Sequence, residues 1–103
     1  MCGRFNLTAS GEEITEHFGL KQIPRHEVLF NIPPGQKILN VVQLEDSSRK
    51  GVYLHWGLIP SWSKDRKISS HLINARSETL NEKPSFRAAF KKRRCLIPAT
   101  GFY

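Results

Sequence analysis

The chain opens with MCGRF, which places a cysteine at the second position. If Met1 is removed, Cys2 carries a free α-amine and a thiol on adjacent carbon atoms. A substantial fraction of an α-amine with a reference pKa of about 7.7–8.0 is neutral, and so nucleophilic, near pH 7.5. The amine and the thiol can both add to one aldehyde and close a five-membered thiazolidine ring, whereas a lysine could form only the imine. From its position alone, the simpler interpretation of Cys2 is a small buried residue at the start of a strand.

A second candidate for chemistry is INARSE, at residues 73–78. If this segment is extended, Asn74 and Arg76 project to the same face, because successive side chains alternate along a strand. Such an amide and guanidinium pair can hold a phosphate or orient a carbonyl group. Without further context, a turn that carries surface charges is the simpler interpretation.

The segment WGLIPSWSKDRK, at residues 56–67, combines two tryptophans with three basic residues. Trp56 belongs to an apolar run and is expected in the core, whereas Trp62 stands between two serines. An exposed tryptophan in a basic loop suits base stacking, which is worth roughly 1–3 kcal/mol per base. The run KKRR at 91–94 is interpreted as a solvated helix end, with contacts to a phosphate backbone as the functional alternative.

We expect no metal and no cofactor. The four histidines form no close ligand pair with one another or with a cysteine. The two cysteines stand at positions 2 and 95, which argues against a disulfide or zinc framework and for a reducing, cytoplasmic setting. No apolar run approaches the ~20 residues that a membrane-spanning helix needs, so no membrane partner is expected.

The positive charge lies in the second half of the chain. The 103 residues have a formal net charge of +7. Residues 1–52 carry six Lys/Arg and six Asp/Glu, whereas residues 53–103 carry ten and three. A basic half is typical of an electrostatic contact with nucleic acid, and a basic protein without a specific partner is the alternative.

The elements that would position these residues are short. Ser10 and Glu13 have the spacing of a capping box, which predicts a helix over residues 11–18 that ends at Gly19. The polar turn EDSSRK separates two apolar runs and predicts an antiparallel hairpin. Strands are expected at residues 1–9, 37–44, 51–59 and from 93 onward, with an extended run ending at 33–35, a polar loop at 60–70 and a short helix at 84–92.

Five motifs together resemble the SRAP family, the SOS response-associated peptidase proteins that process abasic sites. They occur in one order along nearly the whole chain: MCGRF, FNIPPGQ (30–36), WGLIPSW (56–62), INARSET (73–79) and KPSFRAAFKKRRCLIPATGFY (83–103). The resemblance implies an α+β fold, a mainly antiparallel, β-barrel-like domain with short peripheral helices. We expect residues 1–103 to be the N-terminal part of one such domain, with its C-terminal half absent.

The resemblance also implies a function. Family members bind single-stranded DNA and capture abasic sites through a thiazolidine formed by the N-terminal cysteine. The same cysteine removes the initiator methionine, which accounts for the peptidase name, and hydrolase or lyase-type activity is implied as well. A bacterial, cytoplasmic location is expected, with association to the nucleoid when the protein is bound to DNA.

Carried over motif by motif, the resemblance implies two catalytic residues and five that bind DNA. Cys2 matches the crosslinking residue, and Asn74 matches an asparagine that positions the sugar and the cysteine amine. The residues matched to DNA contacts are Arg4, Asn31, Pro34, Trp62 and Arg76, with Arg76 on a phosphate and Trp62 against bases beside the lesion.

The sequence departs from the family pattern in two places. Ser63 stands where many members carry a second aromatic residue, which reduces the stacking surface. The family motif continues after the position of Tyr103 with a glutamate general acid/base, and a catalytic histidine follows later. We therefore expect impaired capture, and a second chain could complete the sheet. The alternatives are a DNA-binding remnant without covalent chemistry and a thiol autopeptidase that acts only on its own N-terminus.

Overall fold

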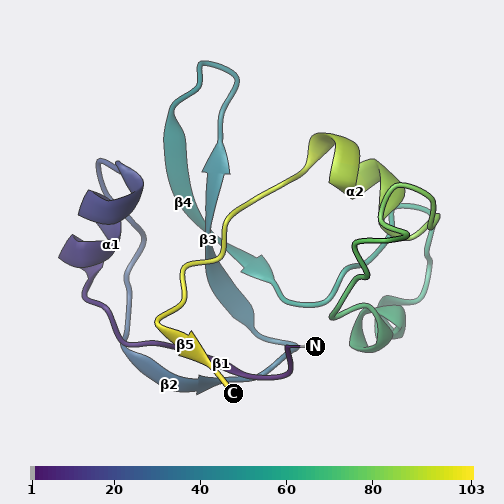
Figure 1. Cartoon of the computed structure of the whole chain (residues 1–103), viewed down its shortest axis with the longest axis horizontal. Coiled ribbons are helices and arrows are strands. Elements are labelled where there is room, and N and C mark those ends of the chain that lie inside the picture. Colours follow the sequence, from purple (N-terminus) through teal and green to yellow (C-terminus); the bar gives the residue numbers. More distant parts are fainter. Residues whose placement is uncertain (1) are drawn as a thin grey trace.

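The structure is a computed structural model that describes residues 2–103, so the expected removal of Met1 lies outside the described residues. It confirms the predicted α+β class with antiparallel sheets (Figure 1). In chain order the elements are β1 (Phe5–Leu7), α1 (Gly11–Phe18), β2 (Leu29–Ile32), β3 (Lys37–Gln43), β4 (Arg49–His55), the 3₁₀ helix η1 (Arg66–His71), α2 (Arg87–Lys92) and β5 (Gly101–Phe102).

Helix α1 has the bounds that its capping residues predict. The Ser10 hydroxyl accepts a hydrogen bond from the Glu13 amide at 3.1 Å, and the Glu13 carboxylate accepts one from the Ser10 amide at 3.2 Å. Gly19 ends the helix with φ of 67°, a left-handed conformation that glycine adopts without a steric cost. Ile14 is buried, so the helix that these caps define turns its apolar side toward the core.

The strands form two separate antiparallel sheets. Strands β3 and β4 make the predicted hairpin, with Lys37 opposite His55 at one end and Gln43 opposite Arg49 at the other. The second sheet has the order β2-β1-β5, so that β1 pairs with a strand on each side. The first and last strands of the chain therefore lie side by side (Figure 1).

The last segment of the chain runs from one sheet to the other. Leu96 exchanges two backbone hydrogen bonds with Val41 of β3, at 2.8 and 3.0 Å, and Phe102 pairs with Phe5 of β1. Buried Pro98 stands between them and has no N–H to donate to a strand ladder. One continuous strand from residue 93 onward, as the sequence predicted, is therefore wrong. The barrel-like form is not observed either, because the strands of residues 2–103 form two separate sheets that do not close.

The loop predicted at 60–70 is also more ordered than expected, because it contains most of η1. The Asp65 side chain caps this short helix by accepting a hydrogen bond from the Lys67 amide at 2.9 Å. Helices η1 and α2 lie on the opposite side of the β3–β4 hairpin from α1 (Figure 1). Residues 72–78 follow η1 without forming a helix or a strand, and this is the segment that carries Asn74.

The core lies between the two sheets and α1. Its buried apolar side chains are Phe5, Leu7, Ile14, Leu20, Ile32, Ile38, Leu39 and Val41. Four consecutive residues of β3 are buried, so both faces of that strand are covered. The buried amide of Asn40 is satisfied, since it donates to the Ile38 carbonyl and accepts from the Cys95 thiol.

We expect Leu39→Ala to lower the free energy of unfolding by ~2–5 kcal/mol, because Leu39 is 3% exposed and its removal leaves a cavity in β3. Urea unfolding followed by circular dichroism measures the change. Leu54→Ala is the matched control in β4, where the side chain is 43% exposed and the cost should be well below that of Leu39→Ala. Equal losses for the two variants would contradict the position of the core.

Candidate functional site

The structure brings Cys2 and Asn74 together from positions 72 residues apart. The backbone nitrogen of Cys2 donates to Oδ1 of Asn74 at 3.2 Å, and Nδ2 of Asn74 donates to the Cys2 carbonyl at 2.9 Å. Among side chains, only the amides of Asn and Gln offer a carbonyl acceptor and an NH₂ donor in one planar group. Asn74 therefore holds both backbone polar groups of Cys2 at once, an arrangement we call the Cys2–Asn74 clamp.

Cys2 lies outside the strand that follows it. It is half-buried, precedes β1 and packs partly against the core, while its Sγ lies 3.8 Å from the Arg4 carbonyl oxygen. Cys2 is thus held both by packing against the core and by the side chain of Asn74.

A cavity of about 270 Å³ lies beside the clamp. Apart from Cys2 and Asn74 its walls are apolar, and they are formed by Phe5, Ile38, Trp56, Ile73, Ile97, Ala99 and Phe102. Among residues 2–103 the lining includes neither a carboxylate nor a histidine. A group that reacts with Cys2 from this cavity would thus meet the clamp and an apolar wall.

Arg4 and Arg76 flank the clamp, because each lies two residues from one of its members. Both side chains are exposed. Among residues 2–103 the one ion pair joins Arg25 to Glu27, so neither flanking guanidinium is neutralised by a carboxylate. Both guanidinium groups are thus exposed and carry an unpaired positive charge among the described residues.

Asn31 and Pro34 lie near the same end of β1. Ile32 pairs with Phe5, so the antiparallel register carries the residues that follow Ile32 back alongside those that precede Phe5. Asn31 is exposed and Pro34 is half-buried. Trp62 is 59% exposed in a turn closed by the Ser63 amide and the Pro60 carbonyl, and no described hydrogen bond or ring contact joins it to the clamp.

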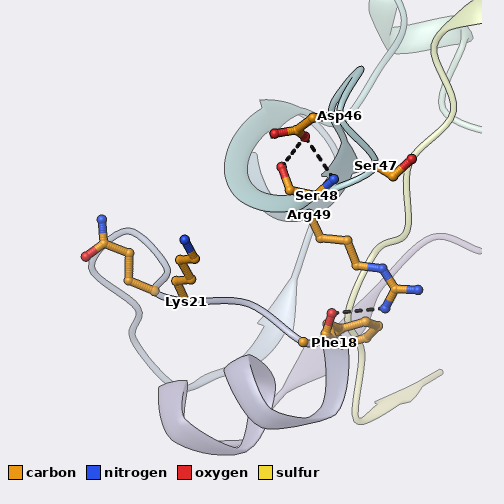
Figure 2. A pocket seen from close by; sticks show the side chains of 8 residues that line it. Phe18, Lys21, Asp46, Ser47, Ser48 and Arg49 are labelled. Carbon is orange, nitrogen blue, oxygen red and sulfur yellow. Dashed lines mark hydrogen bonds between the residues drawn. The ribbon is translucent and has the colours of Figure 1, made fainter.

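A larger cavity, of about 460 Å³, lies between the end of α1 and the turn of the β3–β4 hairpin (Figure 2). Arg49 donates to the Phe18 carbonyl there at 3.0 Å. Asp46 accepts hydrogen bonds from the hydroxyl and the amide of Ser48, and these lower the pKa of its carboxyl group. The Arg49 bond joins the hairpin to the end of the helix, whereas the Asp46 bonds lie within the turn. None of the predicted site residues lines this cavity.

Two further observations concern metals and membranes. Nowhere in residues 2–103 do three His, Cys, Asp or Glu side chains gather in a way that could hold a metal ion. Both cysteines are free thiols, and burial raises the pKa of Cys95. Within the same residues, no helix has the length and apolar character needed to cross a membrane.

The fold and the clamp define an α+β domain whose second residue is a cysteine held by an asparagine. The model of the SOS response associated peptidase (SRAP) family matches residues 1–103, and the chain belongs to this family.

The curated relatives that match the whole of this chain include two abasic site processing proteins. The abasic site processing protein YoqW of Bacillus subtilis is 47% identical over 106 residues, which make up 47% of that protein. The abasic site processing protein HMCES of Rattus norvegicus is 44% identical over 126 residues, and the match covers 36% of it. The chain therefore spans about half the length of YoqW and less of HMCES.

The fold has a solved counterpart. A crystal structure of a protein from Bordetella bronchiseptica superposes with a TM-score of 0.77 at 26% sequence identity. The match covers 99% of this chain and 50% of that one.

Proposed function

We propose that this chain takes part in the processing of abasic sites in single-stranded DNA and that Cys2 is its nucleophile once Met1 has been removed. The observation that carries the proposal is the Cys2–Asn74 clamp, which holds the nitrogen of Cys2 at 3.2 Å from Oδ1 of Asn74. Family membership and the names of the relatives supply the substrate class. Action on DNA agrees with a cytoplasmic, nucleoid-associated location.

The proposed reaction joins the protein to the ring-opened sugar aldehyde of the abasic site. The α-amine attacks the aldehyde carbon, and loss of water gives an imine. Sγ of Cys2 then adds to the same carbon and closes the thiazolidine ring. The aldehyde oxygen leaves as water with two protons from the amine when the imine forms, and the thiol proton moves to the ring nitrogen when the carbon–sulfur bond closes the ring.

The reaction of residues 1–103 alone should be slow. The cavity beside Cys2 has neither a carboxylate nor a histidine in its lining, so water must move the protons. General acid–base groups typically contribute about 10²–10⁴-fold to a rate. The aminothiol is reactive without such groups, so the covalent product still forms.

In this proposal the flanking arginines hold the phosphates on either side of the lesion. Arg76→Ala should weaken binding of a single-stranded oligonucleotide and lower the slope of log K against log salt concentration by about 0.7, the value for one phosphate contact. Fluorescence anisotropy at several salt concentrations measures both quantities. Arg25→Ala is the control, because Arg25 is paired with Glu27 and belongs to no predicted contact. An equal change in slope for the two variants would contradict the assignment of Arg76.

We also propose that a second chain completes the β2-β1-β5 sheet along β5. Among residues 2–103 that strand pairs only with β1, and Phe102 is 79% exposed upon it. An unpaired edge that displays large apolar side chains favours pairing with another strand. Such a partner would also cover the cavity beside Cys2, since Phe102 lines it.

A denaturing gel of the chain after incubation with an abasic single-stranded oligonucleotide tests the proposed function. A heat-stable shifted band supports covalent capture. Binding in a native gel without a denatured shift identifies a DNA-binding remnant. Loss of Met1 with neither band identifies a thiol autopeptidase.

A further inference from the structure

Trp56 touches each of the segments that build the site. From the sequence this residue was expected only in the core, and it does pack partly against the core. We infer that Trp56 is a positioning residue, which sets Asn74 against Cys2 through the hydrogen bond of its indole N–H. This inference rests on the proposed function, because it concerns how fast Cys2 reacts.

The indole holds the residue next to Asn74. Nε1 of Trp56 donates to the Ile73 carbonyl at 3.0 Å, in a partly buried position. Residues 72–74 belong to no helix or strand, so their place is not fixed by a ladder of backbone hydrogen bonds. The indole hydrogen bond is therefore one of the bonds that tie this segment to the residue after β4.

The ring and the backbone of Trp56 reach the other two segments. Its ring packs against Phe5 of β1, with centroids 5.5 Å apart and planes at 58°. Its amide donates to the Gln36 carbonyl at 2.9 Å, and its own carbonyl accepts from the Gly35 amide at 3.0 Å. The strand after Cys2, the loop after Pro34 and the segment of Asn74 thus all meet at one side chain and its backbone.

Gly57 allows the third of these segments to approach. Its φ is 128°, and a Cβ atom there would stand 2.7 Å from the Ser69 carbonyl oxygen, closer than such contacts allow. The next residue, Leu58, donates its amide to the Leu72 carbonyl at 3.0 Å. The backbone bond at Leu58 and the indole bond at Ile73 fix two successive carbonyls just before Asn74.

Trp56→Phe removes the indole donor and keeps a ring to pack against Phe5. It leaves the partly buried Ile73 carbonyl without this partner, and Asn74 loses part of its support. Small misplacements of reacting groups lower rates strongly, so we expect the first-order rate of crosslinking to abasic DNA to fall about tenfold. Reversible affinity for the same oligonucleotide should change less than about twofold, because no DNA-binding residue is altered.

A double-mutant cycle with Asn74→Ala separates positioning from general destabilisation. If Trp56 acts through Asn74, Trp56→Phe will not slow the reaction further once Asn74 is alanine. An additional tenfold loss in that background would overturn the inference, and so would an unchanged rate in the single variant. Tyr53→Phe is the matched control, since it deletes a similar hydrogen bond, from the Tyr53 hydroxyl to the Arg25 carbonyl at 2.9 Å, and should leave the rate unchanged.

A measurement without DNA tests the positioning role of Trp56 separately from the proposed function. Nδ2 of Asn74 donates to the Cys2 carbonyl, so its side-chain protons should exchange slowly with water in an NMR experiment. Trp56→Phe should speed that exchange, and Tyr53→Phe should not. If the wild-type chain forms no adduct but the exchange responds in this way, the proposed function fails and the positioning role stands. Unchanged exchange in Trp56→Phe would overturn the positioning role.

Discussion

Cys2→Ala will abolish the heat-stable adduct between this chain and abasic single-stranded DNA. The variant keeps the backbone, and once an aminopeptidase has removed Met1 it keeps an α-amine that can form an imine with the sugar aldehyde. An imine hydrolyses on heating, whereas a thiazolidine has a second bond to the same carbon, through sulfur. The shifted band on a denaturing gel should fall below detection, while affinity in a native gel is retained.

Cys2→Ser tests the role of the sulfur alone, because it keeps a side chain of similar size and replaces only the sulfur with oxygen. It should behave as Cys2→Ala does under heat, yet reduction with borohydride should trap its imine as a stable band. The other cysteine gives an internal control. Burial raises the pKa of Cys95 and it carries no α-amine, so Cys95→Ala should leave the adduct unchanged. A heat-stable band in Cys2→Ala would contradict the assignment of the nucleophile.

Asn74→Ala has the second largest expected effect. The amide makes hydrogen bonds of 3.2 and 2.9 Å to the two backbone groups of Cys2, and the variant removes both. Two hydrogen bonds of about 1 kcal/mol each, together with the lost orientation of the nucleophile, correspond to a rate about 30- to 100-fold slower. Single-turnover kinetics with excess protein would measure the rate without a contribution from product release.

Asn74→Asp tests whether both halves of the amide are needed. A carboxylate only accepts hydrogen bonds, so it can bond the Cys2 nitrogen but places an oxygen against the Cys2 carbonyl. We expect a rate between those of the wild-type chain and Asn74→Ala. If Asn74→Ala reacts as fast as the wild-type chain, the clamp does not contribute to the chemistry.

The local elements could be predicted from the sequence, because their signals lie within a few residues. The spacing of Ser10 and Glu13 and the glycine at position 19 define α1 at both ends. The turn between the two apolar runs likewise defines the β3–β4 hairpin. These features depend on hydrogen bonds between near neighbours, which a short stretch of sequence specifies.

The long-range arrangement could not be derived in this way. Pro98 interrupts the last strand, so residue 96 pairs with one sheet and residues 101–102 pair with the other. No local sequence pattern predicts these pairings. The approach of Asn74 to Cys2 depends on a segment without regular structure. The resemblance to a family named both residues, and the structure adds the hydrogen bonds that join them.

Trp56 shows the limit of reading residue types one at a time. An apolar neighbourhood marked it as a core residue, and its ring does pack against Phe5. Its indole N–H also reaches the Ile73 carbonyl, a contact that depends on Gly57 and on the path of residues 69–72. A buried indole N–H usually needs a hydrogen-bond partner. The expected burial of Trp56 could therefore have predicted that its indole makes such a bond.

Intact-mass spectrometry of the wild-type chain after incubation with an abasic single-stranded oligonucleotide tests the central claim most directly. The account predicts a covalent species whose mass is that of the chain without Met1 plus the oligonucleotide minus one water, with the modification on Cys2 after digestion. A chain that has lost Met1 and still forms no such species, or forms it on a lysine, would contradict the account.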